Sequence, residues 1–504
     1  MAATSPITVT QLDDILTRFY IPRMFEQIRV ENPGYEFFKD MNSVVTWGPG
    51  NEAHFPVRQK AKRAVVGGTT GRLPTGGAAS YATRQFNYPI YRTLINFLWD
   101  SKLRAGNERY IKNLIDQAIT DAKQEFLRRQ NIYLYGGTFG HIPPGAANIT
   151  VADVVKTSGD VLSSFTDATM GTQCMVGITT TTADGGSDDP LKVKMPWRAG
   201  NGFNTGYSEE GGLWLQPGDN IVIARGNTYV ARQVTSVTRD NYNGDGTSGA
   251  ADVVLNATIS ITGGEDDCYI YLAAPSDITA AEAALDATGT PTYELSDINA
   301  GSFGFANMLF DQSYLGARKA ASQATPDDAY WDSVINHNSG TQRTVTNALI
   351  DRVILEMNQR FYVKPDLMIM NPGMWHEFLN LNHFGTGGNA HAFRNQDSLP
   401  LAGHTPGANP KYVTAKATTG QGDLKVLVDH YCPHSRVIIC NTEDMGYATA
   451  HAMAEASEDG KFLRHDATAY DQWHGWMRWA GNFVSFSPSS VGVVQDLDQS
   501  IVAL

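Results

Sequence analysis

The clearest hydrophobic pattern in the chain lies in residues 107–137 and has the period of a helix. Apolar side chains recur there every three or four residues, with charged residues at other positions. The apolar stripe consists of Ile111, Ile115, Ala118, Ile119, Ala122 and Phe126. Asn107 is a suitable N-cap and Gly136 or Gly137 a suitable stop, so the pattern predicts one helix about 40 Å long.

In residues 44–95 the apolar positions recur every second residue, which is the period of a strand. Phe86, Tyr88 and Ile90 alternate with polar residues or proline, as they would in a strand. We therefore expect two long extended segments joined by a glycine-rich tip. The glycines of the tip are Gly67, Gly68, Gly71, Gly76 and Gly77.

Residues 1–43 have no sustained period and are predicted as an irregular arm. One short helical stretch stands out around residues 12–28, with Ile15, Phe19 and Met24 on one face. Pro22 interrupts it, and a proline costs a helix interior about 3 kcal/mol.

After the long helix, residues 165–290 are rich in Gly, Thr and Asp and contain short alternating runs. The turn signals PGD, RGN and NGDG separate these runs, which predicts a small β-sandwich or barrel inserted at this point. Helical periodicity returns in residues 344–361, where the apolar stripe is Leu349, Ile350, Val353, Ile354, Met357 and Phe361.

The remaining segments predict short strands and one short helix. A buried strand in PDLMIMNP should stop at Asn371-Pro372, and a helix carrying Trp375, Phe378 and Leu379 should follow. Residues 384–410 are predicted as a loop, LKVLVDHY and RVIICNT as strands, and residues 461–504 as aromatic-rich β segments.

Charge is distributed unevenly along the chain. The 504 residues have a formal net charge of -13, and only 18% of them are charged, which suits a protein with much surface buried between subunits. Residues 53–99 contain no Asp or Glu. Their cations are Arg58, Lys60, Lys62, Arg63, Arg72, Arg84 and Arg92. This asymmetry would let one copy of the chain attract another, whereas the overall acidity argues against a general nucleic-acid binder.

No motif in the sequence identifies a catalytic, cofactor or metal site. GGTTGRLPTGG lacks the lysine of a phosphate-binding loop and has proline where the helix should begin. The spacings of His376, His383 and His391 match no metal motif, and Pro433 separates His430 from His434. We therefore expect no enzyme, no cofactor and no metal.

One register fits a calcium loop, with Asn241, Asn243, Asp245, Gly246 and Asp252 at the ligand positions. The flanking segments are strands rather than helices, so a β-hairpin turn explains the same residues more simply. The four cysteines have no CxxC spacing and are expected to be free thiols.

The chain has no run of about 18 apolar residues, and its N-terminus lacks the pattern of a signal peptide. These observations predict a soluble chain made in a cytoplasm, with no membrane partner.

The order of these parts resembles that of the major capsid proteins of tailed double-stranded DNA bacteriophages, the family with the HK97 fold. LTRFYIPRMFEQIRVENPGYEFF resembles the N-terminal arm of that family, and residues 52–97 resemble its extended loop. The helix at 107–137 is similar to its spine helix, residues 344–380 to the start of its axial domain, and 424–450 to the later axial strands. Residues 461–494 resemble the return to the peripheral domain.

The resemblance implies an α+β, HK97-like capsid fold with an inserted β-rich domain. It divides the chain into an N-terminal arm (1–43), an extended loop forming a two-stranded arm (44–98), a peripheral domain with the spine helix (99–164), a β-rich insertion (165–290), a connection (291–343), an axial domain (344–456) and a return to the peripheral domain (457–504).

The same resemblance implies self-assembly into hexamers and pentamers that form an icosahedral head shell. The shell would enclose double-stranded DNA, held non-specifically on its inner face, in a virion assembled in the host cytoplasm. Separate scaffolding, portal and cement or decoration proteins are implied partners. The residues expected to contact a neighbouring subunit are Arg58, Lys60, Lys62, Arg63, Gly67, Gly68, Gly71, Arg72, Gly76, Gly77 and Arg84.

Some members of the family cross-link a loop lysine to an asparagine of a neighbour. Lys60 and Lys62 are placed for such a bond, although ordinary salt-bridging lysines are the simpler interpretation.

Two alternative functions stay open at this point. One is an encapsulin-like compartment shell with the same fold. The other is a β-rich carbohydrate-binding protein or hydrolase in which Trp214, Trp473 and Trp476 stack on sugars; core or interface aromatics are the simpler interpretation of these tryptophans.

Overall fold

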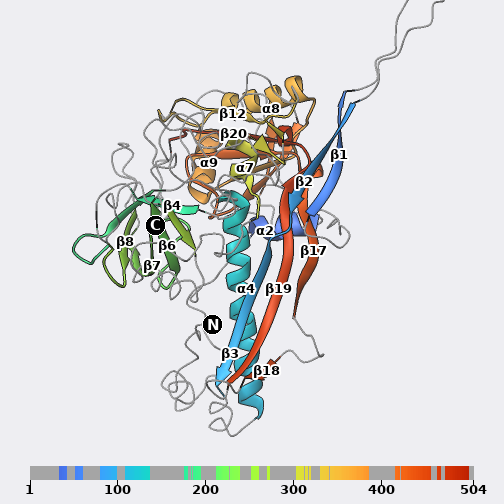
Figure 1. Ribbon diagram of the computed structural model, residues 1–504. Helices are drawn as coiled ribbons and strands as arrows, with labels where there is room; N and C mark the ends of the chain where they lie inside the picture. The colour runs from blue at the N-terminus through green and yellow to red at the C-terminus, as the bar shows by residue number, and fades with distance from the viewer. Residues whose placement is uncertain are drawn as a thin grey trace, which may run out of the picture.

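A computed structural model shows the arrangement of the chain (Figure 1). It describes residues 33–41, 52–60, 80–98, 108–136, 175–179, 183, 185–194, 212–225, 228–238, 251–259, 269–272, 302–310, 313–315, 317–318, 330–339, 341–384, 415–419, 422–455, 463–466 and 472–498. The helical stretch predicted around residues 12–28 and most of the loop predicted at 384–410 lie outside these residues.

The predicted long helix is α4 (Glu108–Gly136), which at 29 residues is about 44 Å long. It runs beside a four-stranded antiparallel sheet (Figure 1). The longest strand of this sheet, β19 (Gln472–Ser485), pairs with β3 (Ile90–Leu98) on one side and with β17 (Met445–Glu455) and β18 (Leu463–Asp466) on the other.

A second, mixed sheet has six strands, and helices cover one of its faces. Its order is β12 (Val334–Asn336), β20 (Val491–Val494), β16 (Val437–Cys440), β13 (Leu367–Met370), β15 (Gly422–Val428) and β14 (Ala415–Thr419). Met368 and Met370 pack in the cluster that includes α8 (Asn347–Phe361) and α9 (Pro372–Phe384). Leu367 and Ile369 belong to the larger core of the body, as the alternation of side chains in a strand requires.

Local signals in the sequence account for both of these helices. Thr346 caps α8 by accepting a hydrogen bond from the Leu349 N–H, and the predicted stripe of α8 is buried apart from Leu349, which is only partly buried. Asn371 accepts a hydrogen bond from the Met374 N–H at 2.7 Å, which caps α9 where the sequence predicted the strand to stop. A Cβ at Gly492 would lie 2.6 Å from Val353 Cγ1, so only glycine lets α8 approach β20 this closely.

The predicted β-rich segment contains a closed six-stranded barrel (Figure 1). Its strands, in order around the barrel, are β4 (Met175–Thr179), β5 (Leu191–Lys194), β8 (Ala251–Leu255), β7 (Thr228–Thr238), β6 (Asn220–Arg225) and β9 (Tyr269–Leu272). The PGD signal forms a turn in which the Asp219 N–H donates to the Gln216 carbonyl at 3.1 Å and Gly218 has φ +93°. Proline and glycine at the two central positions are typical of a type II turn.

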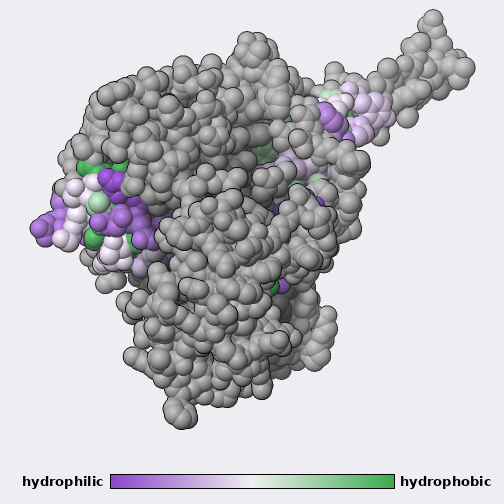
Figure 2. Space-filling model, turned by 60° about the horizontal axis from the view of Figure 1, so that its bottom comes forward, coloured by the Kyte–Doolittle hydropathy of each residue, from purple (hydrophilic) through white to green (hydrophobic). Residues whose placement is uncertain are grey.

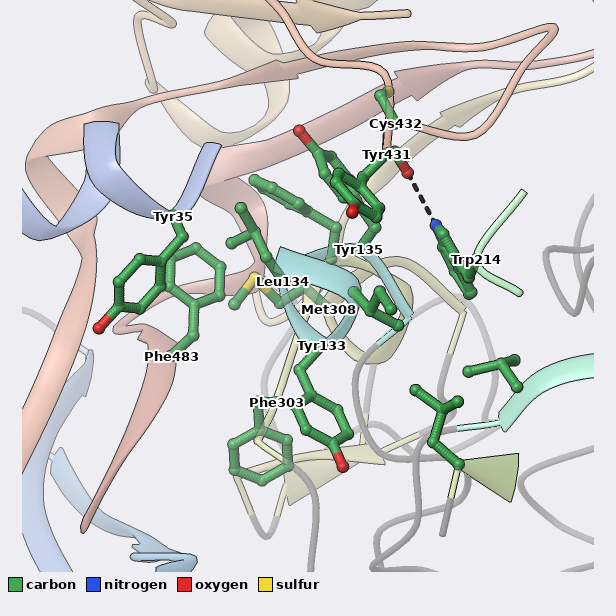
Figure 3. Packing of buried hydrophobic residues seen from close by; sticks show 14 of the residues in the cluster. Tyr35, Tyr133, Leu134, Tyr135, Trp214, Phe303, Met308, Tyr431, Cys432 and Phe483 are labelled. Atoms are coloured by element: carbon green, nitrogen blue, oxygen red, sulfur yellow. Dashed lines mark hydrogen bonds between the residues drawn. The ribbon is translucent and has the colours of Figure 1, made fainter. Parts of the chain in front are cut away.

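The last two turns of α4 are buried on every side. Ile132, Tyr133, Leu134 and Tyr135 are all at most 3% exposed, and they pack against α2 (Pro33–Met41), α7 (Phe305–Phe310) and the barrel side of the body (Figure 3). The amphipathic stripe predicted for the earlier turns therefore does not describe the end of the helix. Smaller elements complete the body, namely β10 (Ser313–Tyr314), β11 (Ala317–Arg318), η7 (Thr442–Asp444) and η8 (Pro488–Ser490).

Two features differ from the expectation for the N-terminal hundred residues. The predicted irregular arm contains a helix, α2 (Pro33–Met41), whose Tyr35, Phe37 and Phe38 are buried. The second extended segment is interrupted at Tyr88-Pro89: β2 (Ser80–Asn87) pairs with β1 (Glu52–Lys60), whereas β3 pairs with β19. The range 44–98 therefore contributes to two separate sheets.

Candidate functional site

The hairpin formed by β1 and β2 is the candidate site. The two strands are antiparallel, from the pair Glu52 and Asn87 to the pair Lys60 and Ser80, with an irregularity in register between Arg58 and Lys60. The predicted pairing of two extended segments is thus confirmed for the described residues. Figure 1 shows the far end of the hairpin extending away from the body, and within the part of the chain that the structure describes β1 and β2 pair only with each other.

Aromatic side chains fix the near end of the hairpin to the body. The Phe55 ring meets the Phe486 ring edge-to-face at 5.2 Å and lies 6.3 Å from Phe86, and Phe86 in turn contacts Tyr88 at 5.4 Å. Phe55, Phe86 and Tyr88 are at most 7% exposed. Burying a phenylalanine contributes about 1.5–3 kcal/mol, so these contacts hold the near end firmly in place.

Arg84 lies on this buried face and corrects one of our expectations. It is only 6% exposed, and its guanidinium carbon lies 4.8 Å from the centre of the Trp331 ring. Trp331 is itself buried and donates its indole N–H to the Tyr314 carbonyl at 3.2 Å. Arg84 was expected to contact a neighbouring subunit; instead it packs within its own chain, because it shares a strand face with Phe86.

The opposite face of the hairpin is exposed. His54 and Pro56 on β1 and Thr83 on β2 point outward, and Tyr81 is 66% exposed. Tyr81 pairs across the ribbon with Arg58, one of the predicted contact residues. In the space-filling view the coloured part of the hairpin, at the upper right, is mostly hydrophilic (Figure 2).

Sequence reasoning missed Tyr81, although a signal for it was present. In YATRQFNY, Arg84, Phe86 and Tyr88 take one face, so the period of two assigns Tyr81 and Thr83 to the other face. The error with Arg84 came from counting charges without assigning faces.

The other predicted contact residues are only partly covered by the structure. Arg58 and Lys60 belong to β1, of which the backbone is described at these positions. Lys62, Arg63, Gly67, Gly68, Gly71, Arg72, Gly76 and Gly77 lie outside the described residues.

The two-stranded hairpin of β1 and β2 has the physical properties of a segment that docks on another protein chain. An isolated two-stranded ribbon is only marginally stable in water, and its outer edges offer unpaired backbone groups to another chain. The outer face carries the exposed Tyr81, and Tyr is enriched among the residues that dominate the binding energy of protein interfaces. The hairpin is therefore suited to docking on another protein surface.

The described residues include some of those considered above for metal binding, calcium binding and cysteine chemistry. Among these, no group of three or more His, Cys, Asp or Glu side chains is arranged to hold a metal ion. Asp252, the last position of the calcium-like register, forms an ion pair with Lys192, and the other four positions lie outside the described residues. Cys432 and Cys440 are buried free thiols, as expected for these two.

Trp214 cannot stack on a sugar in this structure. It is fully buried, and its indole N–H donates to the Tyr431 carbonyl at 2.9 Å (Figure 3). Trp473 and Trp476 belong to β19, but their side chains are not among the described ones. Trp214 is therefore a core residue, in agreement with the simpler of its two interpretations.

A buried ion pair joins the barrel to α4. Arg128 is 3% exposed and donates from Nη1 to Asp219 Oδ1 and from Nη2 to Asp219 Oδ2, both at 2.7 Å, and from Nη2 to the Trp214 carbonyl at 2.9 Å. Because Asp219 closes the PGD turn of the barrel, this fork holds the barrel at a defined position on the helix.

We expect Arg128→Lys to lower the free energy of unfolding by about 1–2 kcal/mol, because lysine keeps the charge but cannot form the two parallel hydrogen bonds. Hydrogen exchange of the barrel amides should rise more than that of β19, since the barrel would be held less firmly. Urea unfolding and mass-detected exchange measure both effects. Equal exchange changes in the barrel and in β19 would contradict the role of the ion pair.

A second buried polar cluster joins three parts of the body at Asp429. Its carboxylate is fully buried and accepts hydrogen bonds from the Gly34 N–H at 3.1 Å, Asn131 Nδ2 at 3.1 Å, the Tyr135 hydroxyl at 2.9 Å and the Tyr431 N–H at 2.9 Å. Asn131 Oδ1 also accepts from the Tyr35 N–H at 3.0 Å.

These contacts cap α2 with side chains from α4 and from the end of β15. Burial raises the pKa of Asp429 from its ordinary value, and its hydrogen bonds oppose that shift. Burial also raises the pKa of the Tyr135 phenol well above its usual range, so this phenol keeps its proton and donates to the carboxylate.

No helix in the described residues has both the length and the apolar character needed to cross a membrane. No family profile and no curated protein matches the chain.

Several solved structures do match. The capsid asymmetric unit of cyanophage A-1(L) has 12% sequence identity and a TM-score of 0.46, with 96% of this chain and 98% of that chain covered. The capsid of a native GTA particle has 8% identity and a TM-score of 0.41, covering 98% of this chain and 99% of that chain. An encapsulin complex from Synechococcus elongatus PCC 7942 has 9% identity and a TM-score of 0.21, covering 34% of this chain and 55% of that chain. Over nearly its whole length, the chain is similar to the capsid chains of the cyanophage and the GTA particle.

Proposed function

We propose that this chain is the major capsid protein of a tailed double-stranded DNA phage. It assembles with copies of itself into hexamers and pentamers and thereby forms the icosahedral head shell around the genome. Its role is structural, not enzymatic. The observation that carries the proposal is the hairpin, which is fixed to the body at one end by buried aromatic rings and extends from it with an exposed, tyrosine-bearing face.

The charge of the chain supports another copy as the partner of the hairpin. Residues 53–99 contain cations and no carboxylate, whereas the whole chain has 52 Asp and Glu against 39 Lys and Arg. The rest of each copy is therefore more acidic than the total and attracts the hairpin of its neighbour. Such complementarity favours the correct encounter and orientation more than it adds affinity.

Under this proposal each observed element corresponds to a part of the HK97 fold. The hairpin is the extended loop, α4 is the spine helix beside the sheet of the peripheral domain, and the six-stranded sheet with α8 and α9 is the axial domain. The barrel is the inserted domain. Contacts with a neighbour are made by Arg58, Lys60, Lys62, Arg63 and Arg72 together with the glycines of the tip, whereas Arg84 is left out because it is buried. Scaffolding, portal and cement proteins and the packaged DNA complete the set of partners.

The direct test is electron microscopy and size-exclusion chromatography of the purified full-length chain. Capsomer rings or closed shells are the expected result. A stable monomer at micromolar concentration, under conditions of pH and salt that leave it folded, would refute the proposal.

We expect Tyr81→Ala to reduce the yield of shells at least about tenfold, because an exposed tyrosine at the centre of a contact typically contributes 1–2 kcal/mol or more to binding. Thermal unfolding of the subunit should not change, since Tyr81 lies outside the core. Thr83→Ala, on the same exposed face, is the matched control and should assemble like the wild type. Equal assembly of all three proteins would show that this face makes no contact.

A further inference from the structure

The end of helix α8 carries a residue that its backbone conformation disfavours. Tyr362 has φ 60° and ψ 25°, which is the left-handed region. Its N–H donates to the Asn358 carbonyl at 2.9 Å, which is the bond of a helix end closed by one left-handed residue, and the Val363 N–H donates to the Met357 carbonyl at 3.3 Å. Glycine or asparagine usually occupies this position, because a large side chain is strained there.

The strain at Tyr362 does not serve packing within the chain. Its side chain is 81% exposed, although the helix positions before it supply a well-packed apolar stripe toward the sheet. Positive φ values at bulky residues persist where the surrounding structure enforces them, and they concentrate at functional positions. The exposed ring is therefore the feature to be explained.

A second exposed apolar side chain lies on the same side of the helix. Leu355 is 41% exposed and precedes Tyr362 by seven residues, which is two helical turns. The exposed stripe of α8 consists of Ala348, Arg352, Leu355, Gln359 and Tyr362. It contains one cation and no carboxylate, and exposed Lys364 follows it. Arg360 is not part of the stripe, since it pairs with Asp332 at 2.8 Å and lies over the Phe361 ring.

We propose that this stripe, anchored by Tyr362, is a second contact between subunits and docks on a neighbouring copy of this chain. The proposal rests on the proposed capsid function. Charge complementarity favours this occupant, because each copy has more Asp and Glu than Lys and Arg, and the stripe is apolar and basic.

The position of the stripe supports the same occupant. Helix α8 packs against β12 and β20 of the six-stranded sheet and is a different element from the hairpin (Figure 1). The angle between neighbours decides whether head-to-tail contacts through the hairpin close into a ring or form open chains. A second contact on a different part of the body sets that angle.

The test is Tyr362→Gly, which removes the ring and relieves the backbone strain. The midpoint of thermal unfolding should stay the same or rise, while the yield of shells in electron microscopy and size-exclusion chromatography should fall at least about tenfold. Tyr362→Asn tolerates the same backbone conformation and should behave alike. Gln359→Ala, on the same stripe, is the control and should assemble normally.

The outcomes separate this inference from the proposed function. A wild-type chain that assembles, together with a Tyr362→Gly variant that assembles equally well, overturns the contact at α8 and leaves the capsid function standing. A folded wild-type chain that stays monomeric overturns both. A Tyr362→Gly variant that stays folded but forms only open or irregular assemblies supports the role of α8 in setting the angle.

Discussion

A chain in which Asn-Gly replaces residues 61–79 should stay folded but form no shells. Asn-Gly is the preferred two-residue turn between antiparallel strands, so β1 and β2 keep their pairing from Glu52–Asn87 to Lys60–Ser80. Phe55, Phe86 and Phe486 hold the near end of the hairpin and are unchanged. The melting temperature should therefore stay within about 3 °C of the wild type, while shells disappear from size-exclusion profiles and micrographs.

The control for this variant exchanges side chains without shortening the hairpin. Replacing Lys62, Arg63 and Arg72 by glutamine removes charge but keeps length, and it should weaken assembly most at low salt, where charge attraction is least screened. Normal shells from the shortened chain would remove the hairpin from the account of assembly. Loss of folding in the shortened chain, shown by circular dichroism, would contradict the independence of the body from the hairpin tip.

The largest loss of stability is expected for Asp429→Ala. The substitution leaves the N–H groups of Gly34 and Tyr431 and the side chains of Asn131 and Tyr135 without their acceptor inside the core. Leaving several buried donors unsatisfied should lower the free energy of unfolding by about 3–5 kcal/mol, measured by urea denaturation. Because the Gly34 N–H belongs to the first turn of α2, the amides of α2 should exchange faster than those of β16.

Asp188→Ala is the matched control, since Asp188 is an exposed carboxylate in a turn of the barrel. It should change stability by less than about 0.5 kcal/mol. An equal effect of the two substitutions would show that the cluster at Asp429 contributes no more than a surface charge.

Asp429 should also leave a signature in the pH dependence of stability. Burial raises its pKa in the folded state, so the folded chain holds this proton at a higher pH than the unfolded chain does. The stabilisation from the protonated form is therefore complete below the ordinary pKa of aspartate and is lost as the pH rises through the raised value. The stability of the wild type relative to Asp429→Asn should accordingly fall as the pH rises through this window.

Part of the candidate site was readable from the sequence, and part was not. The two strands, the glycine-rich tip and the absence of acidic residues in 53–99 are properties of the chain itself. Which surface covers the apolar face depends on where the strands lie against the body. The period of two assigns Arg84 and Phe86 to one face and Tyr81 to the other, but Phe486, which Phe55 meets, lies 431 residues further along the chain and is brought to the hairpin only by the fold.

The sequence by itself determined the features that a few neighbouring residues decide. Helix α8 with its Thr346 cap, the end of β13 at Asn371-Pro372, the PGD turn and the period of α4 all follow from contacts within about four positions along the chain. Only the tertiary structure decided that α2 is a helix, because its N–H groups at Gly34 and Tyr35 are capped by Asp429 and Asn131, which are 395 and 96 positions away. The tertiary structure also decided where β2 ends and β3 begins, and that the end of α4 is buried on all sides. These depend on distant surfaces that supply hydrogen bonds and apolar contacts, and such surfaces come together only when the whole chain has folded.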